Sequence, residues 1–291
     1  MNRYLKANRD LARDLVLSCV SAAYKIFGQN SWLKRPRVHF LMLHHLHSDE
    51  IVPFRMLLQI IMEDHYFINY SDAVEKIRSG HIDKPYIAIS LDDGLKTSLN
   101  AVQIMREFGI TGCFFICPSV IGQKDDQKIK EFCSQKIHRP PMEFLDWDDV
   151  EILMKEGHEV GSHSMNHENI GGLPIDRIQA EIVESFEILR KRTGGVRHFA
   201  WPYGRFSEFT PAAARIVFET GFHSCASGER GCHVVKREGD DISLCIRRDP
   251  IVAKWPLSHI LYFLSRSSKR ASILDNQWPL GWLEAIRGEA K

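Results

Sequence analysis

The chain has 291 residues, 44% of them hydrophobic, so it can bury a sizeable core as one α/β barrel or as two smaller domains. It carries 38 basic and 37 acidic side chains, a formal net charge of +1. Nucleic-acid-binding proteins normally have a marked basic excess, so this balance argues against nucleic acid as a partner. Seven cysteines without zinc-finger spacing predict reduced, mostly buried thiols in a cytosolic protein.

The first 28 residues predict an amphipathic helix. Leu11, Leu15 and Cys19 fall on one helical stripe, and Asp10 and Asp14 fall on another. The apolar run is too charged at its start for a signal peptide and too short to span a membrane, so we expect a cytoplasmic protein. We expect the helix to dock on the protein's own body or on a partner, and peripheral contact with a membrane surface is the alternative.

Apolar strands alternate with helices from residue 38 onward. The predicted strands are 38–48, 86–91, 111–118, 158–162, 197–202, 222–227 and 242–248. The predicted helices are 54–67, 70–80, 98–109, 145–157, 174–195 and 210–221. This order predicts a parallel sheet with helical crossovers, and about seven such units would close a distorted (β/α)7-type barrel. Functional residues of such a barrel lie at the carboxyl ends of its strands.

Three regions flank or interrupt this pattern. We expect residues 1–37 to form the N-terminal helix and linker, 38–252 the catalytic domain, and 253–291 a C-terminal helical extension. The extension is rich in Trp, aliphatic and basic residues, so it either covers the barrel or, with the N-terminal helix, contacts a membrane. The polar segment 122–144 is either a lid or substrate loop or a passive surface excursion.

Acidic and imidazole side chains follow two of the predicted strands. Asp92 and Asp93 are adjacent, and two carboxylates at the end of a buried strand need a cation to neutralise at least one of them. His163 and His167 are four residues apart, which puts both imidazoles on one side of a helical turn. Two imidazoles and one carboxylate form a three-ligand set with open positions, as catalytic zinc and related divalent sites require.

Three short motifs occur in order at predicted strand ends: "SLDDG" at 90–94, "HSMNH" at 163–167 and "AWPYG" at 200–204. They resemble the Thr-Phe-Asp-Asp-Gly, His-Ser/Thr-x-x-His and Arg-x-Pro-Tyr-Gly motifs of the polysaccharide deacetylases, the chitooligosaccharide deacetylase-like carbohydrate esterases of family 4. The segment "FLMLHHLHSDE" also resembles the Leu-Met-Tyr-His opening strand of one bacterial branch. The resemblance covers roughly residues 38–248.

The resemblance implies a metal-dependent hydrolase that removes the N-acetyl group from a GlcNAc-type residue of a glycan or glycolipid and releases acetate. It implies that Asp93, His163 and His167 bind one divalent ion, zinc first, with cobalt or nickel as alternatives. It implies that Asp92 stays off the metal and acts as the general base on the attacking water.

The third motif departs from the family at Ala200, where the family has an arginine that orients the catalytic aspartate. The same bacterial branch takes this arginine from a later strand, and "LCIRRDPI" supplies Arg247 and Arg248. We favour Arg248 because of its distance to the following Pro250. An ordinary surface arginine at a strand end is the alternative.

The resemblance also implies groups around the reacting carbonyl. Pro202, Tyr203 and Gly204 would form a stiff turn in which the backbone N–H of Tyr203 helps to hold the oxyanion. The late Leu-x-His motif that supplies the family's general acid is not evident. His45 is the leading candidate to line the site, and a core histidine that caps its own strand is the alternative. Weaker candidates are His223, His233 and His259.

Two other functions stay open. The protein could be an amidase or esterase for another acylated small molecule, because the metal centre acts on the acyl group while loops select the rest. It could also be a catalytically dead glycan-binding homologue, which Ala200 and the absent late histidine favour. The intact "LDDG" and "HSMNH" oppose that second alternative, since a binder needs no base beside a metal.

Overall fold

The computed structural model describes residues 17–19, 33–234, 243–271 and 278–288. The expected N-terminal helix lies outside these residues, apart from 17–19, which are helical. The strands are β1 (Arg37–Leu43), β2 (Tyr66–Phe67), β3 (Pro85–Leu91), β4 (Gly112–Ile116), β5 (Glu159–Ser162), β6 (His198–Ala200), β7 (Ser224–Ala226), β8 (Cys232–His233), β9 (Cys245–Ile246) and β10 (Asp249–Pro250). The helices are α2 (Ile51–Met62), α3 (Tyr70–Ser79), α4 (Leu99–Glu107), α5 (Asp126–Gln135), α6 (Trp147–Lys155), α7 (Ile175–Thr193), α8 (Pro211–Thr220), α9 (Leu257–Ala271) and α10 (Trp282–Arg287).

One curled sheet runs in the order β10-β1-β3-β4-β5-β6-β7-β9, and neighbours along this path are parallel. Its two edges are joined by a single stretch of chain, because β9 pairs with β7 and β10, three residues later, pairs with β1. β1, the strands β3 to β7, and the stretch 245–250 therefore make seven positions around the sheet. The predicted distorted (β/α)7-type barrel is confirmed.

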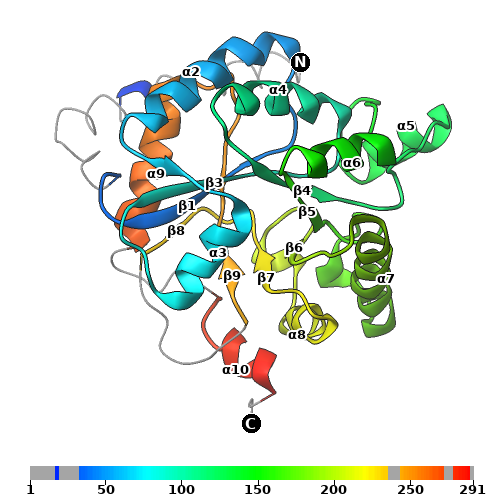
Figure 1. Ribbon diagram of the computed structural model, residues 1–291. Helices are drawn as coiled ribbons and strands as arrows, with labels where there is room; N and C mark the ends of the chain where they lie inside the picture. The colour runs from blue at the N-terminus through cyan, green and yellow to red at the C-terminus, as the bar shows by residue number, and fades with distance from the viewer. Residues whose placement is uncertain (1–16, 20–32, 235–242, 272–277, 289–291) are drawn as a thin grey trace, which may run out of the picture.

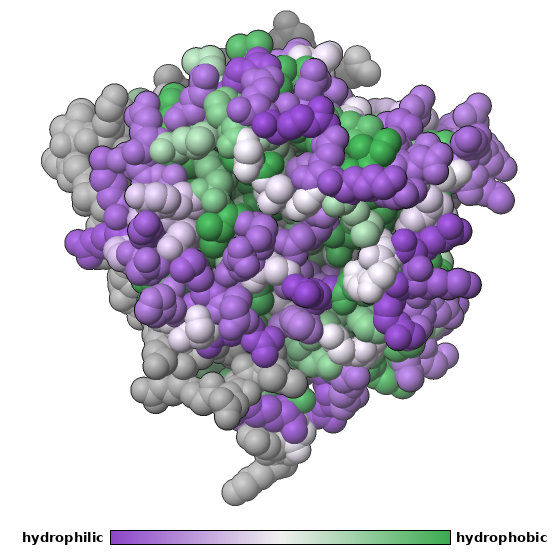
Figure 2. Space-filling view, viewed as in Figure 1, coloured by the Kyte–Doolittle hydropathy of each residue, from purple (hydrophilic) through white to green (hydrophobic). Residues whose placement is uncertain are grey.

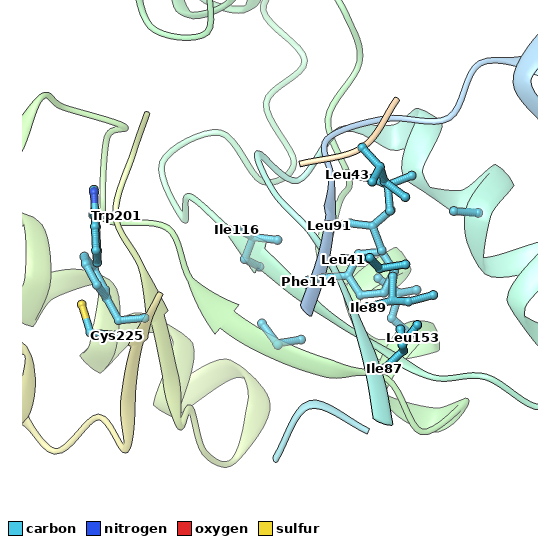
Figure 3. Close-up of a cluster of buried hydrophobic side chains, with 14 of the residues drawn as sticks. Leu41, Leu43, Ile87, Ile89, Leu91, Phe114, Ile116, Leu153, Trp201 and Cys225 are labelled. Carbon is cyan, nitrogen blue, oxygen red and sulfur yellow. The ribbon is translucent and has the colours of Figure 1, made fainter. Parts of the chain in front are cut away.

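The side-chain alternation of the strands separates two hydrophobic layers. Odd-numbered residues of β1 and β3, such as Leu41 and Ile89, face the helices, as the side chains in Figure 3 show. Even-numbered residues, such as Phe40 and Ala88, pack inside the barrel against residues of β4, β6 and β7. In Figure 1, α2, α4 and α6 lie together along one side of the sheet, and α7 and α8 lie beside β5 to β7.

The structure adds to or corrects the sequence-based expectation at two places. The helix predicted over 54–67 begins at Ile51 and ends at Met62, and Tyr66–Phe67 instead form β2, which pairs with β3. The polar segment 122–144 contains a helix of its own, α5, whose N-cap Asp125 accepts hydrogen bonds from the backbone N–H groups of Gln127 and Lys128. Neither element has enough hydrophobic periodicity to be recognised, because β2 has two residues and α5 buries one.

The C-terminal helices pack on the barrel. Ser267 of α9 donates to the Asp249 carboxylate at 2.7 Å, and Arg215 of α8 donates to the Ile286 carbonyl of α10 at 3.0 Å. Figure 2 shows hydrophilic residues over most of one face, with hydrophobic residues in small groups between them. Among the described helices, none combines the length and hydrophobicity needed to cross a membrane.

Candidate metal centre and catalytic cavity

Three side chains converge at the carboxyl end of the barrel. The Oδ1 atom of Asp93 lies 3.5 Å from Nε2 of His163 and 3.3 Å from Nε2 of His167. All three residues are buried, and their ligand atoms lie within 4.8 Å of one another. Neither contact has hydrogen-bond geometry, so Oδ1 has no hydrogen-bond partner among the described residues. A buried carboxylate oxygen that faces two imidazole nitrogens in this way fits a divalent cation.

The three side chains shift one another's pKa values in different directions. Burial raises the pKa of Asp93, but His163 and His167 outweigh burial, and the pKa lies well below its usual range. Burial lowers the pKa of His167, which keeps this imidazole neutral. Burial also lowers the pKa of His163, but Asp93 and Asp92 outweigh burial and raise it overall. The Nδ1 atom of His163 contacts the Ala200 carbonyl at 2.8 Å, and donating that bond leaves the Nε2 lone pair toward Asp93.

The backbone that positions these side chains is strained. Asp93 follows β3 with φ +74°, and Tyr203 follows β6 with φ +63°. The expected helical turn at His163 and His167 is wrong. They lie in a loop after β5, where Ser164 and His167 have φ of +64° and +55° and thereby bring the two imidazoles together. Strain of this kind persists where the surrounding structure enforces it and is typical of functional sites.

Asp92 lies beside the three candidate ligands but is held by another residue. Arg248 donates from Nη1 to Asp92 Oδ1 at 2.7 Å and from Nη2 to Oδ2 at 2.8 Å. The guanidinium also donates to the hydroxyl of Ser90 and the carbonyl of Ser227, and it lies over the ring of Phe115. Both charged groups are buried, so this bidentate pair fixes the orientation of the carboxylate.

These residues line one cavity of about 120 Å³. Its walls are Met42, His44, Asp92, Asp93, Ile137, His138, Arg139, His163, His167, Trp201, Tyr203, Gly204 and Arg248. The cavity combines a candidate metal site with a carboxylate that is not one of the ligands. That combination is suited to metal-assisted hydrolysis.

Comparison with known proteins agrees with this chemistry. Residues 79–220 match the family described as polysaccharide deacetylase. This part of the chain is a polysaccharide deacetylase domain. It contains Asp92, Asp93, His163, His167 and the turn at 202–204, whereas Arg248 lies beyond it.

The fold of the chain is shared by solved structures at low sequence identity. The deacetylase PplD of Streptococcus pyogenes, solved with acetate, matches at a TM-score of 0.62 and 16% identity, over 79% of this chain and 99% of that one. IcaB from Ammonifex degensii matches at 0.63 and 17%, over 79% and 97%. A de-N-acetylase from Aggregatibacter actinomycetemcomitans matches at 0.63 and 17%, over 78% and 100%.

The chain departs from the family's third motif in a way that its structure explains. Ala200 has no side chain to reach Asp92, but its carbonyl accepts the hydrogen bond from His163. Arg248 lies beside Asp92 instead, from the stretch that joins the two edges of the sheet. Arg247, the other candidate, packs its guanidinium 4.9 Å from the ring centre of Phe206.

His44, rather than the expected His45, lies on the cavity wall. Met42 and His44 lie two residues apart and share the inner face of the barrel, whereas His45 points away and contacts Arg139 and Glu50. The alternation along β1 contains this information, and so does the Leu-Met-Tyr-His resemblance, which places its histidine at 44. The weaker candidates are absent from the cavity wall: His223, His233 and His259.

The turn at 202–204 closes one side of the cavity. Tyr203 and Gly204 line it, while Pro202 is buried behind them. Gly204 has φ +75°, and a Cβ there would lie 2.5 Å from the backbone nitrogen of Gly228. Only glycine therefore fits this position.

The segment 122–144 also reaches the cavity. Its residues Ile137, His138 and Arg139 form part of the wall, which agrees with a substrate loop better than with a passive excursion. Sequence reasoning singled out the segment but none of these three residues. A short polar run after a helix has no hydrophobic periodicity, so the sequence does not indicate which of its side chains face the cavity.

Proposed function

We propose that the protein is a metal-dependent hydrolase that removes the N-acetyl group from a GlcNAc-type residue of a glycan or glycolipid and releases acetate. The observation that carries the proposal is the position of Asp92, which is oriented by Arg248 and lies beside Asp93, His163 and His167 without belonging to that set. A binding module has no use for such a base.

Asp93, His163 and His167 would hold one divalent ion, with zinc proposed first. The ion would supply Lewis-acid polarisation of the acetamide carbonyl and of the attacking water. Asp92 accepts the proton that water loses as it attacks the carbonyl carbon, and Arg248 keeps its carboxylate in one orientation. The Tyr203 backbone N–H, in the turn at the cavity wall, is proposed to donate to the oxyanion.

The departing amine needs a proton, and His44 is the proposed donor. It lies on the cavity wall directly after β1 and is not one of the three candidate ligands. His138 also lines the cavity, but it is an exposed residue. We expect His44→Gln to lower kcat more than it changes KM, since proton donation contributes to the transition state rather than to substrate binding.

The first test is acetate release from N-acetylglucosamine oligomers and from a lipid-linked N-acetylglucosamine, with zinc, cobalt or a chelator present. We expect Asp92→Asn to keep stoichiometric zinc and lose turnover by at least about 100-fold, because it removes the base but no ligand. His163→Ala should lose both zinc and turnover. An unchanged rate in Asp92→Asn would show that this carboxylate is not the base.

Two alternatives are outcomes of the same assay. Release of acetate from O-acetyl sugars or small amides, but not from N-acetylglucosamine, would favour the amidase or esterase. Binding of an N-acetylglucosamine oligomer without release of acetate would favour the dead homologue. The main argument for that alternative was the missing arginine at position 200, and Arg248 lies beside Asp92 in its place. A lipid-linked substrate and peripheral membrane contact stay proposals. A cytoplasmic location is also a proposal, and the buried thiols that form no disulfide, at 113, 117, 133, 225, 232 and 245, support it.

A further inference from the structure

Arg139 is a cation on the cavity wall for which the structure gives no carboxylate among the residues it describes. The other charged groups on the wall are committed. Asp92 and Arg248 neutralise each other, and Asp93 faces His163 and His167. We propose that Arg139 binds an anionic group, a phosphate or a carboxylate, carried by the acetylated sugar. This inference rests on the proposed function and deepens it by naming the substrate class.

The guanidinium is held in place by an imidazole rather than by an acid. Nη1 of Arg139 donates to Nε2 of His45 at 2.7 Å, and Nδ1 of His45 lies 3.6 Å from the buried carboxylate of Glu50. Burial and the charge of Arg139 both lower the pKa of His45, so the imidazole is neutral and accepts this bond. His45 is thus a positioning residue that fixes Arg139 and uses one of its five N–H donors, which leaves others to bind a ligand.

The segment that carries Arg139 is anchored on both sides. The Arg139 N–H donates to the Cys133 carbonyl at 2.8 Å, which ties it to the end of α5. The Tyr203 hydroxyl donates to the Lys136 carbonyl at 2.8 Å, and Lys136 pairs with Glu168 at 2.7 Å. The segment is therefore tied to the turn and the histidine loop that form the candidate active site.

Backbone strain marks the same segment as functional. His138 has φ +53°, an unfavourable conformation for a residue with a side chain. The described non-glycine residues with positive φ are Asp93, His138, Ser164, His167 and Tyr203, so His138 shares this feature with the candidate metal centre. The strain at His138 positions Arg139, the next residue, at the wall.

The chemistry of the Arg139 side chain favours an oxyanion ligand. A guanidinium presents a planar fork of donors that matches two oxygens of a carboxylate or phosphate, which a lysine ammonium does not. Burial lowers the pKa of His45 and disfavours any second positive charge beside Arg139. The Arg139 guanidinium is therefore a fixed positive charge at the cavity wall that no described carboxylate offsets, as a substrate with an anionic group near the acetamide requires.

The test compares kcat/KM of the zinc-loaded enzyme on N-acetylglucosamine, its 1-phosphate, its 6-phosphate and N-acetylmuramic acid. We expect a preference of about 10- to 100-fold for one anionic sugar over N-acetylglucosamine, carried mainly by KM. Arg139→Gln should bring the ratio of kcat/KM on the anionic sugar to kcat/KM on N-acetylglucosamine down to about 1. Arg139→Lys should keep part of the preference. The two phosphates and the carboxylate of N-acetylmuramic acid identify the source of the anion.

Arg55→Gln is the matched control, because Arg55 lies on α2 in an exposed pair with Glu107. It should leave the ratio unchanged. A purely structural role of Arg139 would lower the rates on neutral and anionic sugars equally, and that result would overturn the inference while the proposed function stands. If no sugar is turned over, the proposed function fails. Calorimetric titration of N-acetylglucosamine 1-phosphate, N-acetylglucosamine 6-phosphate and N-acetylmuramic acid then tests the anion site directly. The inference is overturned if the wild type binds none of the three, or if wild type and Arg139→Gln bind each of them equally.

Discussion

A single arginine connects the closure of the barrel to the candidate base. Arg248 and Asp92 are both buried, so removing one partner leaves the other as an uncompensated charge. We expect Arg248→Met to lower the free energy of unfolding by about 3 kcal/mol in urea titrations and to lower kcat at least about 10-fold. Arg247→Met is the control, because this neighbour packs on an aromatic ring instead.

The double variant Asp92→Asn/Arg248→Met separates the two causes of lost stability. It removes both charges, so it should be more stable than Arg248→Met alone. A double variant less stable than either single one would show that packing, rather than the unpaired carboxylate, explains the loss.

At the residue scale, the sequence predicted which residues carry the chemistry better than it predicted which way their side chains point. Asp92, Asp93, His163 and His167 were identified because each follows a strand whose end had to lie at the barrel mouth. Their roles as base and ligands stay predictions until metal binding and turnover are measured. His44 and Arg139 were not chosen, because the choice between adjacent side chains depends on which one faces inward. For Arg139 that depends on tertiary contacts such as the Tyr203 hydroxyl bond to Lys136.

At the element scale, the turn after β6 can be tested with two glycines. Gly204 and Gly109 have φ of +75° and +65°, but a Cβ at 204 meets the backbone of Gly228 while a Cβ at 109 meets open space. We expect Gly109→Ala to lower the free energy of unfolding by about 1 kcal/mol and to leave acetate release unchanged. Gly204→Ala should cost clearly more and lower kcat, because the turn must move away from Gly228. Equal costs in the two variants would show that φ alone matters.

The same scale shows which elements the sequence could reveal. The helices with a clear hydrophobic stripe, such as α4, α7 and α8, lie within the ranges predicted for them. The two-residue strands β2, β8 and β10 were missed as strands of their own. Their pairing is decided by the neighbouring strand rather than by their own side chains.

At the scale of the whole molecule, the repeated strand–helix order predicted the barrel and its functional end. The closure was not predictable, because β9 and β10 are short and separated by only Arg247 and Arg248. This closure buries His39 beside Asp249 and Ser268, while His65 is half-buried near Ile61 after α2. The two histidines therefore make stability depend on pH in opposite directions.

Burial lowers the pKa of His65 from 6.5 to about 4, so the unfolded chain takes up a proton that the fold rejects. Its contribution is fully present above pH 6.5 and is lost as pH falls toward 4. Burial also opposes the charge on His39, but Cys232 and Asp249 outweigh it and raise its pKa to about 9. That contribution is fully present below pH 6.5 and is lost as pH rises toward 9.

Urea titrations at pH 7.5 and 5.0 on the wild type, His65→Gln and His39→Gln measure these contributions as differences. Between the two pH values, the advantage of the wild type over His65→Gln should fall by about 2 kcal/mol on acidification. Its advantage over His39→Gln should rise by about 1 kcal/mol, because over this pH range the folded imidazole holds a proton that the unfolded imidazole binds only in part. The same substitution at the two sites must therefore give changes of opposite sign. Changes of the same sign would show that the groups around His39 do not hold its proton in the folded state.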